Sequence, residues 1–493
     1  MNHNATRWYF DVAALIAGAL FPFSLSPFGL WPLALVAPVA LFWSARSGST
    51  RRTVLRFYLF NLGMFAVGVS WIFVSIHNYG GASVPLAGIL VGSLVAAYSL
   101  VCVPLAYVYA RFFRQSDISQ VLGFVALWVL QEWFRSWFLT GFPWLFLGYG
   151  VMETPIANFA PYFGVFGVSF VSVLAMLSLL LAVERQKIAW VVPPMLVLTV
   201  GFVLERIPLT SPDGSIDVSL VQGNVDQHVK WRPENRLPIL NHYRQATEDE
   251  WGRDLIVWPE ASITIFREYA TEYLDQLDKE GKTRHTSLVL GIPDRNEEGR
   301  FLNTLLAIGE GDGRYVKRRL VPFGEYVPLE QYLRGVLSVF DLPMSRNRPG
   351  PANQPPILVG DHTVSVSICY EVVYPDLVRR AAESPALLLT VSNDTWFGAS
   401  IGPWQHLQMA QMRALENGRS MVRATNNGVT AVIDHRGKLV ASLPQFEKGI
   451  LRQSVELRRG DTPFHRYGSW PVLGLCLSML LLQWGHVLLR RIM

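Results

Sequence analysis

Long apolar runs fill both ends of this chain, and a stretch of mixed polarity lies between them. A helix needs about 20 mostly apolar residues to cross a bilayer. Runs of this kind predict eight membrane spans, near residues 8–23, 25–44, 57–76, 86–110, 118–139, 162–183, 188–205 and 470–489. The pattern therefore predicts a membrane domain of about seven helices at 1–206, a polar domain at 207–463, and a final span within 464–493.

Within 207–463, short apolar runs alternate with longer polar stretches of helical character. The runs predict strands at 216–221, 255–258, 287–291, 302–308, 364–369, 386–392, 420–424 and 429–433. The polar stretches predict helices at 234–251, 268–281, 374–383 and 404–418. Alternation of strands and helices is typical of an α/β sheet covered by helices.

Composition and charge support this division. The chain is 51% hydrophobic and 16% charged, whereas soluble domains average about 25% charged residues. Residues 207–463 hold 29 of the 43 basic and 32 of the 38 acidic side chains, so the remaining 14 basic and 6 acidic residues give the apolar parts a positive excess. This excess indicates membrane topology signals rather than a nucleic-acid surface, because no basic stripe lies on the polar domain.

The basic residues of the apolar parts fall at alternate ends of the predicted spans. The loops 24–26, 78–85 and 140–161 contain no Lys or Arg. Cytoplasmic loops are enriched in Lys and Arg. The distribution therefore predicts that both termini are cytoplasmic and that 207–463 lies on the other side, which in a bacterium is the periplasmic face of the inner membrane.

A glutamate, a lysine and a cysteine at three strand ends form a nucleophilic set. Glu260 follows 255–258, Cys369 ends the run 364–369, and Lys317 precedes a proline-punctuated loop. A carboxylate can take the proton of an attacking thiol, and an ammonium can stabilise a thiolate or an oxyanion. Cys369 is the one cysteine of 207–463, so a disulfide within this domain is excluded.

The order and flanks of Glu260, Lys317 and Cys369 resemble the Glu-Lys-Cys triad of the nitrilase superfamily. With the membrane spans, the chain resembles the membrane-embedded branch of that superfamily, the apolipoprotein N-acyltransferases, over nearly its full length. The resemblance rests on an ordered set of short motifs: TGFPW at 140–144, QGN at 222–224, WPE at 258–260, VPFGEYVP at 321–328, CYE at 369–371, GPWQH at 402–406 and TNNG at 425–428.

The resemblance implies a multi-pass helical membrane domain joined to an α/β domain of four layers, an α-β-β-α sandwich. It implies that Cys369 takes the sn-1 acyl chain of a phospholipid, typically phosphatidylethanolamine, as a thioester. The chain then passes to the α-amine of the S-diacylglyceryl-cysteine of an apolipoprotein, the last step of bacterial lipoprotein maturation. Glu260 is expected to be the general base and Lys317 the oxyanion stabiliser.

Further residues are expected near the triad. Glu325, Glu371 and Tyr370 are candidate supporting residues, although Glu371 equally suits an ion pair with Arg413 or Arg423. Tentative substrate contacts are Asn224, Trp231, Trp396 and Phe397, for which ordinary packing is the competing interpretation, and His406 suits a structural role at a helix start.

Two other functions remain open from the residues alone. One is a membrane-tethered amidase of the nitrilase type, in which water resolves the thioester. The other is a transporter or receptor whose outer domain binds a ligand. We expect no metal and no cofactor, because no ligand spacing and no glycine-rich phosphate loop occurs, and nothing requires more than a monomer. The apolar stretch 328–343 suits an arm that dips into the bilayer interface.

Overall fold

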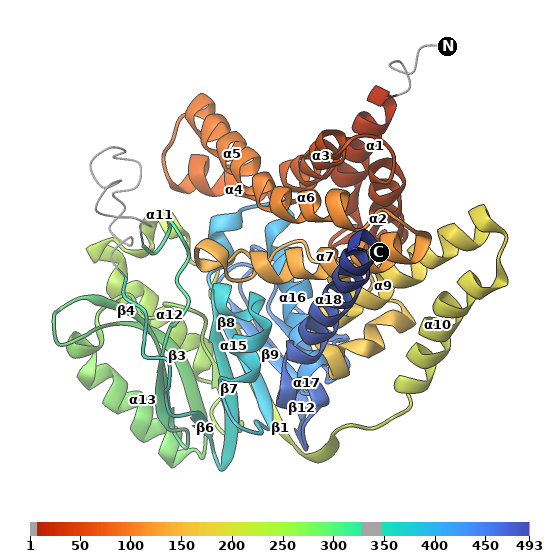
Figure 1. Cartoon of the computed structure of the whole chain (residues 1–493). Coiled ribbons are helices and arrows are strands. Elements are labelled where there is room, and N and C mark those ends of the chain that lie inside the picture. The colour runs from red at the N-terminus through yellow and green to blue at the C-terminus, as the bar shows by residue number, and fades with distance from the viewer. Residues whose placement is uncertain (1–6, 327–346, 493) are drawn as a thin grey trace. The chain divides into compact units, whose positions relative to one another are not determined.

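The computed structural model describes residues 7–326 and 347–492, which form two compact units (Figure 1). The first unit comprises Met1–Phe73, Ser83–Pro208 and Arg466–Met493, and the second comprises Val74–Ala82 and Leu209–His465. Residues Val74–Ala82, predicted as part of the membrane domain at 1–206, group instead with the second unit. The arm expected at 328–343 lies outside the described residues.

The first unit is helical. Its helices are α1 (Arg7–Leu20), α2 (Pro32–Ala45), α3 (Thr50–Gly68), α4 (Trp71–Val74), α5 (Val84–Ser99), α6 (Val103–Phe112), α7 (Asp117–Arg135), α8 (Leu147–Gly150), α9 (Ala160–Arg185), α10 (Val192–Leu204) and α18 (Trp470–Ile492). The last residue of α4, Val74, belongs to the second unit. Apolar helices thus occur where the hydrophobic runs predict them.

Two of the described helical stretches, Val84–Phe112 and Pro155–Arg185, are long and apolar enough to cross a membrane. A third candidate is the pair Thr50–Gly68 and Trp71–Tyr79, which is bent by 51°. Shorter apolar helices cover Trp8–Ser24, Pro32–Ala45, Ile188–Leu204 and Trp470–Gly485. These apolar helices suit a membrane protein, and the count of eight spans stays a prediction.

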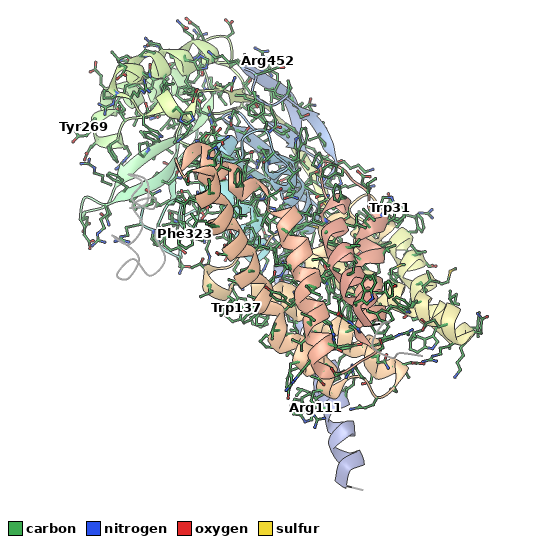
Figure 2. All side chains as sticks on the ribbon, turned by 90° about the horizontal axis from the view of Figure 1, so that it is seen from above. Trp31, Arg111, Trp137, Tyr269, Phe323 and Arg452 are labelled. Atoms are coloured by element: carbon green, nitrogen blue, oxygen red, sulfur yellow. The ribbon has the colours of Figure 1, made fainter. Side chains whose placement is uncertain are left out.

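Large apolar side chains lie exposed along the helices of the first unit. Trp31 is 40% and Trp137 is 45% exposed, and both are marked in Figure 2. Valine, leucine and isoleucine side chains of α5, α9 and α10 are exposed as well. Exposed apolar side chains in such numbers are typical of helices that face lipid.

The second unit contains two six-stranded sheets. The strands of the first, in spatial order β12-β1-β2-β3-β4-β5, are β12 (Gly449–Arg459), β1 (Ser211–Gln222), β2 (Leu255–Val257), β3 (Ser287–Arg295), β4 (Phe301–Gly309) and β5 (Gly313–Val316). Those of the second, in the order β11-β10-β9-β8-β7-β6, are β11 (Leu439–Ser442), β10 (Ala431–Ile433), β9 (Met421–Thr425), β8 (Leu387–Ser392), β7 (His362–Ile368) and β6 (Ile357–Val359).

The two sheets share one apolar core. It takes side chains from strands of both sheets, among them Val218, Val257, Val366 and Val391. A second apolar cluster joins the other face of the first sheet to α12 (Arg236–Thr247) and α13 (Thr271–Thr283). Helices α15 (Pro375–Arg379) and α16 (Gly402–Asn417) contact β7 and β9 of the second sheet. The predicted nitrilase-like α/β domain is therefore confirmed as a two-sheet structure.

The eight strands predicted from the apolar runs are all present as β1 to β4 and β7 to β10. The short strands β5, β6 and β11 and the closing strand β12 were not predicted. Strand β11 is largely exposed, and β12 alternates buried with exposed positions, so neither has the continuous apolar run by which the others are recognised. The short helices α11 (Gln227–Lys230) and α17 (Pro463–Tyr467) were also not predicted.

Parallel pairing brings several strand ends to the same edge. Strands β1, β2 and β3 pair in parallel in the first sheet, and β7, β8 and β9 pair in parallel in the second. Residues that follow such strands meet at the carboxyl edge of the sheet, which is where α/β proteins commonly place their sites. Glu260, Cys369 and Asn393 are all in this position.

Candidate active site

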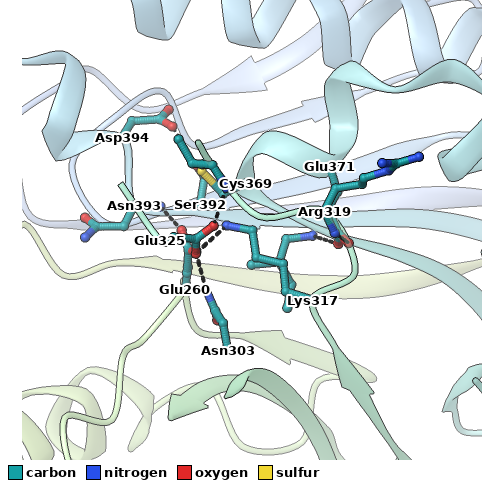
Figure 3. A network of polar contacts seen from close by, with 12 residues as sticks. Glu260, Asn303, Lys317, Arg319, Glu325, Cys369, Glu371, Ser392, Asn393 and Asp394 are labelled. Atoms are coloured by element: carbon teal, nitrogen blue, oxygen red, sulfur yellow. Dashed lines mark hydrogen bonds and ion pairs between the residues drawn. The ribbon is translucent and has the colours of Figure 1, made fainter. Parts of the chain in front are cut away.

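The three predicted catalytic residues follow strands of both sheets. Lys317 comes directly after β5, and Cys369 comes directly after β7. Glu260 lies three residues beyond the end of β2. Figure 3 shows these side chains close together, with Glu325, Asn303 and the β8 end residues around them.

The ammonium of Lys317 lies between two carboxylates. Its Nζ is 2.9 Å from Oε1 of Glu325 and 3.4 Å from Oε1 of Glu260. The side chain is 1% exposed. Burial lowers the pKa of Lys317, but Glu325 and Glu260 outweigh this and raise it well above its ordinary value. Lys317 is therefore a permanent cation at this point.

Three groups fix the carboxylate of Glu260. Besides Lys317, the side-chain amide of Asn303 donates to Oε1 at 2.7 Å, and the main-chain N–H of Asn393 donates to Oε2 at 2.8 Å. The ammonium of Lys230 donates to the main-chain carbonyl of Glu260 at 3.4 Å. Both the carboxylate and the backbone of this residue are thus held in place.

Glu325 closes the cluster on the other side of the ammonium. Its Oε1 also accepts from the amide of Asn303 at 3.3 Å, and its Oε2 accepts from the main-chain N–H of Val321 at 2.8 Å. Asn303 therefore binds both carboxylates at once and sets the distance between them. This arrangement agrees with the supporting role expected for Glu325.

Cys369 stands at the turn from β7 into a 3₁₀ helix over Cys369–Val373, with a left-handed backbone at φ +52°. Burial and the carboxylate of Glu260 raise the pKa of the Cys369 thiol, while Lys317 lowers it; the net shift is upward. A thiol in these surroundings is protonated at neutral pH. It needs a base to become a nucleophile, and Glu260 is the neighbouring carboxylate that can serve.

Glu371 connects the ends of β5 and β7. Its Oε1 accepts from the main-chain N–H groups of Arg318 at 2.6 Å and Arg319 at 3.1 Å, and its Oε2 accepts from that of Ile368 at 2.9 Å. The Tyr315 hydroxyl donates to the same carboxylate. Burial raises the pKa of Glu371 in spite of these donors.

The contacts of Glu371 decide between its two sequence-based interpretations. Arg413 pairs with Glu416, and Arg423 pairs with Asp394, so the expected arginine partners are occupied elsewhere. Glu371 instead fixes the strand end that carries Lys317 relative to the turn that carries Cys369. Tyr370, which lies between Cys369 and Glu371 in the sequence, is buried. Its ring packs edge-on against that of Tyr374, with the ring centroids 5.3 Å apart.

Two of the tentative substrate contacts lie on the loop after β1. The side chain of Asn224 donates to the carbonyl of Phe446 at 2.6 Å, and its main-chain N–H donates to the carbonyl of Asn426 at 2.7 Å. Asn224 therefore ties loops together. Trp231 is partly exposed, and its buried indole N–H has no hydrogen-bond partner within the described residues.

The other two tentative contacts, Trp396 and Phe397, lie in the 3₁₀ helix Asp394–Phe397 that follows β8. Trp396 is partly exposed, and its ring meets that of Tyr79 edge-on at 5.7 Å. Phe397 is buried with its ring 5.8 Å from that of His406. Packing thus accounts for Phe397, whereas Trp231 and Trp396 are only partly buried, and a substrate contact stays a prediction for both.

The structure also brings in residues that the sequence analysis did not select. Asn303 binds two carboxylates, Asn393 binds Glu260 through its backbone, and Lys230 is fully buried beside Glu260. Burial lowers the pKa of Lys230 to about 8, although Glu260 opposes this. A polar residue inside the apolar run of β4 was the available signal for Asn303; the Lys230 position follows from loop packing and has no sequence signal.

Together these groups can perform acyl transfer on a thiol. A protonated nucleophile, a fixed carboxylate base and a permanent ammonium lie within one cluster. The ammonium can bind the oxygen that becomes negative when a carbonyl carbon is attacked. Within the described residues, no group of three or more His, Cys, Asp or Glu side chains is placed to hold a metal ion.

Two family models match the chain. The model of the apolipoprotein N-acyltransferase N-terminal domain matches residues 17–178, and the carbon-nitrogen hydrolase model matches residues 217–461. Among solved structures, a carbon-nitrogen hydrolase from Helicobacter pylori G27 aligns with a TM-score of 0.37 and 15% identity, covering 52% of this chain and 94% of that one.

Curated relatives match over almost the whole length. An apolipoprotein N-acyltransferase of Azotobacter vinelandii is 46% identical, covering 98% of this chain and 96% of that protein. The enzyme of the same name from Pseudomonas syringae pv. tomato is 43% identical, covering 98% and 97%, and that from Vibrio vulnificus is 38% identical, covering 96% of each. This similarity over nearly the full length shows that the chain belongs to the apolipoprotein N-acyltransferase family.

Proposed function

We propose that this enzyme transfers an acyl chain from the sn-1 position of a phospholipid to the N-terminal amine of a diacylated apolipoprotein, the last step of bacterial lipoprotein maturation. The observation that carries the proposal is the buried ammonium of Lys317 between Glu260 and Glu325, next to the thiol of Cys369. An ester and an amine are the substrates on which such a cluster can act through a thioester.

In the first half-reaction, the Cys369 sulfur attacks the ester carbonyl carbon while its proton passes to Glu260. The carbonyl oxygen becomes an oxyanion, which Lys317 and the main-chain N–H of Tyr370 stabilise. The carbon–oxygen bond of the ester then breaks, and the leaving oxygen takes the proton from Glu260. A lysophospholipid departs, and the acyl chain remains as a thioester.

In the second half-reaction, the α-amine of the lipoprotein attacks the thioester. Glu260 takes a proton from the amine, the carbon–sulfur bond breaks, and the Cys369 thiolate is protonated again. Because the pKa of the Cys369 thiol is raised, the resting enzyme holds a neutral thiol, and the base is needed in the first half-reaction. The amide product is stable, and its release returns the cluster to its starting protonation state.

The proposal includes a membrane setting. We propose eight spans, with domains at 1–206, 207–463 and 464–493, both termini in the cytoplasm and the α/β domain in the periplasm. The exposed apolar helices and the distribution of Lys and Arg support this topology. Both substrates carry acyl chains, so an enzyme anchored in the bilayer reaches them without extracting them into water.

The test uses the full-length enzyme in detergent, incubated with phosphatidylethanolamine and analysed by intact-protein mass spectrometry. We expect a mass gain of one acyl chain, absent in C369S and discharged by a synthetic diacylated lipopeptide. Cys476 is a buried cysteine of α18, so C476S is the matched control and should still form the adduct.

The outcomes separate the competing functions. An adduct that water discharges and the lipopeptide does not would support a tethered amidase. A folded enzyme that forms no adduct would remove the Cys369 assignment and favour a binding protein. An adduct that persists in C369S would place the nucleophile elsewhere.

A further inference from the structure

A buried polar network contacts the backbone of the proposed nucleophile, Cys369, and has no part in the reaction steps described above. It consists of Asp394, His406 and Arg423, whose side chains are at most 1% exposed. Asp394 follows β8, His406 lies in the first turns of α16, and Arg423 is in the middle of β9. Figure 3 shows Asp394 beside Ser392 and Cys369.

The network reaches the backbone of the nucleophile through one atom. Nε2 of His406 is 3.1 Å from the main-chain carbonyl oxygen of Cys369. A carbonyl oxygen only accepts hydrogen bonds, so Nε2 must carry the hydrogen. This contact lies at the residue whose backbone is left-handed, at φ +52°.

The partners of the other ring nitrogen keep His406 in this form. Nδ1 lies 3.1 Å from both Nη2 of Arg423 and Oδ1 of Asp394. Burial and Arg423 lower the pKa of His406, and the opposing effect of Asp394 is smaller. The ring is therefore neutral at neutral pH, with Nδ1 accepting from Arg423 and Nε2–H pointing at Cys369.

The positive charge of Arg423 and the negative charge of Asp394 balance each other, so the network needs no charge on His406. Arg423 donates to Oδ2 of Asp394 at 2.6 Å, and the Ser392 hydroxyl donates to Oδ1 at 2.5 Å. Burial raises the pKa of Asp394, but the cation of Arg423 opposes this most strongly, and that pKa lies well below its ordinary value. Asp394 and Arg423 thus form an ion pair that orients a neutral imidazole.

The local sequence makes room for this network. A methyl group added at Gly428 would lie 2.3 Å from Oδ2 of Asp394, so a larger residue would displace the carboxylate. Gly428 ends the TNNG motif, and His406 ends the GPWQH motif. Both motifs, which the proposed reaction does not use, therefore serve the same cluster.

We propose that His406 is a positioning residue for acyl transfer, whose Nε2–H bond to the Cys369 carbonyl holds the strained nucleophile turn, with Asp394 and Arg423 fixing the tautomer. A non-glycine residue in the left-handed region costs about 1–3 kcal/mol and persists only where its surroundings hold it. A displacement of about 1 Å at a reacting atom can cost about 100-fold in rate. The inference rests on the proposed role of Cys369.

The experiment compares H406Q with H406N in the full-length enzyme. The amide nitrogen of glutamine reaches the position of Nε2, whereas that of asparagine reaches only the position of Nδ1. The rate constant of acyl-adduct formation and the amplitude of the adduct are measured by intact-protein mass spectrometry over a range of phosphatidylethanolamine concentrations. L407A, a cavity variant at the buried neighbour in α16, is the matched control for packing.

We expect H406N to acylate about 10–100-fold more slowly per active enzyme, with an unchanged half-saturating lipid concentration, and H406Q to stay within a few fold of the wild type. L407A should lower only the adduct amplitude. Equal rate constants in H406N and H406Q, or a loss confined to amplitude, would overturn the inference. If the wild type itself forms no adduct at Cys369, the proposed function fails instead.

Discussion

Replacement of Lys230 by methionine should stabilise the protein and weaken its activity. Lys230 is fully buried, and its one hydrogen bond among the described residues is to the Glu260 carbonyl at 3.4 Å. No carboxylate of the described residues lies within ion-pair distance of its ammonium. A buried cation without such a partner is costly to the folded state.

The lowered pKa of Lys230 sets the size of the stability gain expected for K230M. A pKa of about 8 in place of 10.5 corresponds to about 3 kcal/mol at neutral pH, since each tenfold change in acidity is worth about 1.4 kcal/mol. The lost hydrogen bond returns about 1 kcal/mol, which leaves a net gain of about 2 kcal/mol for K230M. For a domain of this size, that raises Tm by about 4–8 °C.

The lowered pKa also determines how the stability difference between the wild type and K230M changes with pH. The unfolded chain keeps the lysine proton up to about pH 10.5, whereas the folded protein releases it near pH 8. The wild type therefore gains stability relative to K230M as pH rises through this window. Thermal unfolding of the detergent-solubilised proteins at pH 7 and pH 9.5 measures both effects.

The same substitution at an exposed lysine of α13, K279M, is the control and should leave Tm nearly unchanged at both pH values. A K230M protein that is less stable than the wild type at pH 7 would refute the reasoning. So would a stability difference that does not narrow toward pH 9.5. The acylation rate of K230M should fall, because the Glu260 backbone loses a contact that holds it in place.

Three further predictions concern the buried polar groups. N303L should slow acyl-adduct formation by about 10–100-fold, because Glu260 and Glu325 each lose a donor worth about 1.5–3 kcal/mol; an unchanged rate would contradict this. E325Q should slow adduct formation by at least about 10-fold and also lower Tm, because the buried Lys317 loses its nearer carboxylate and keeps Glu260; an unchanged rate by mass spectrometry or an unchanged Tm would contradict this. R423M should lower the free energy of unfolding by about 3–5 kcal/mol, because it leaves Asp394 buried without its cation. That deficit should be fully present above about pH 4 and shrink as the pH falls further, because the unfolded chain binds a proton at Asp394 near pH 4, whereas the pKa of Asp394 in the folded wild type lies well below that; a deficit independent of pH would argue against this reasoning.

Residues with a direct sequence signal were predictable. Glu260 and Cys369 are polar residues placed right after apolar strands, and the parallel pairing of those strands brings their ends to one edge. Lys317 was distinguishable from the adjacent Arg318 and Arg319 only through its motif, because all three are basic. The buried ammonium of Lys317 pairs with Glu325, which lies eight residues further along the chain, and with Glu260, which is distant in the sequence.

Residues whose role depends on tertiary contacts were not predictable in this way. Glu371 binds main-chain N–H groups that follow another strand, so no pairing rule for side chains could identify its partners. Lys230 lies on a helix of four residues, too short for a periodic pattern. Strand β6 has three residues, too few for a recognisable pattern, and its pairing with β7 is a tertiary contact.

The pairing of β1 with β12 has a consequence for how the chain is made. Ser211 opposes Arg459 in this antiparallel ladder, so the first and last strands of the α/β domain complete each other. A chain synthesised from its N-terminus exposes one edge of β1 until β12 has emerged, and an unpaired edge is a template for aggregation. Chains that stop before residue 449 should therefore be poorly soluble even when every catalytic residue is present.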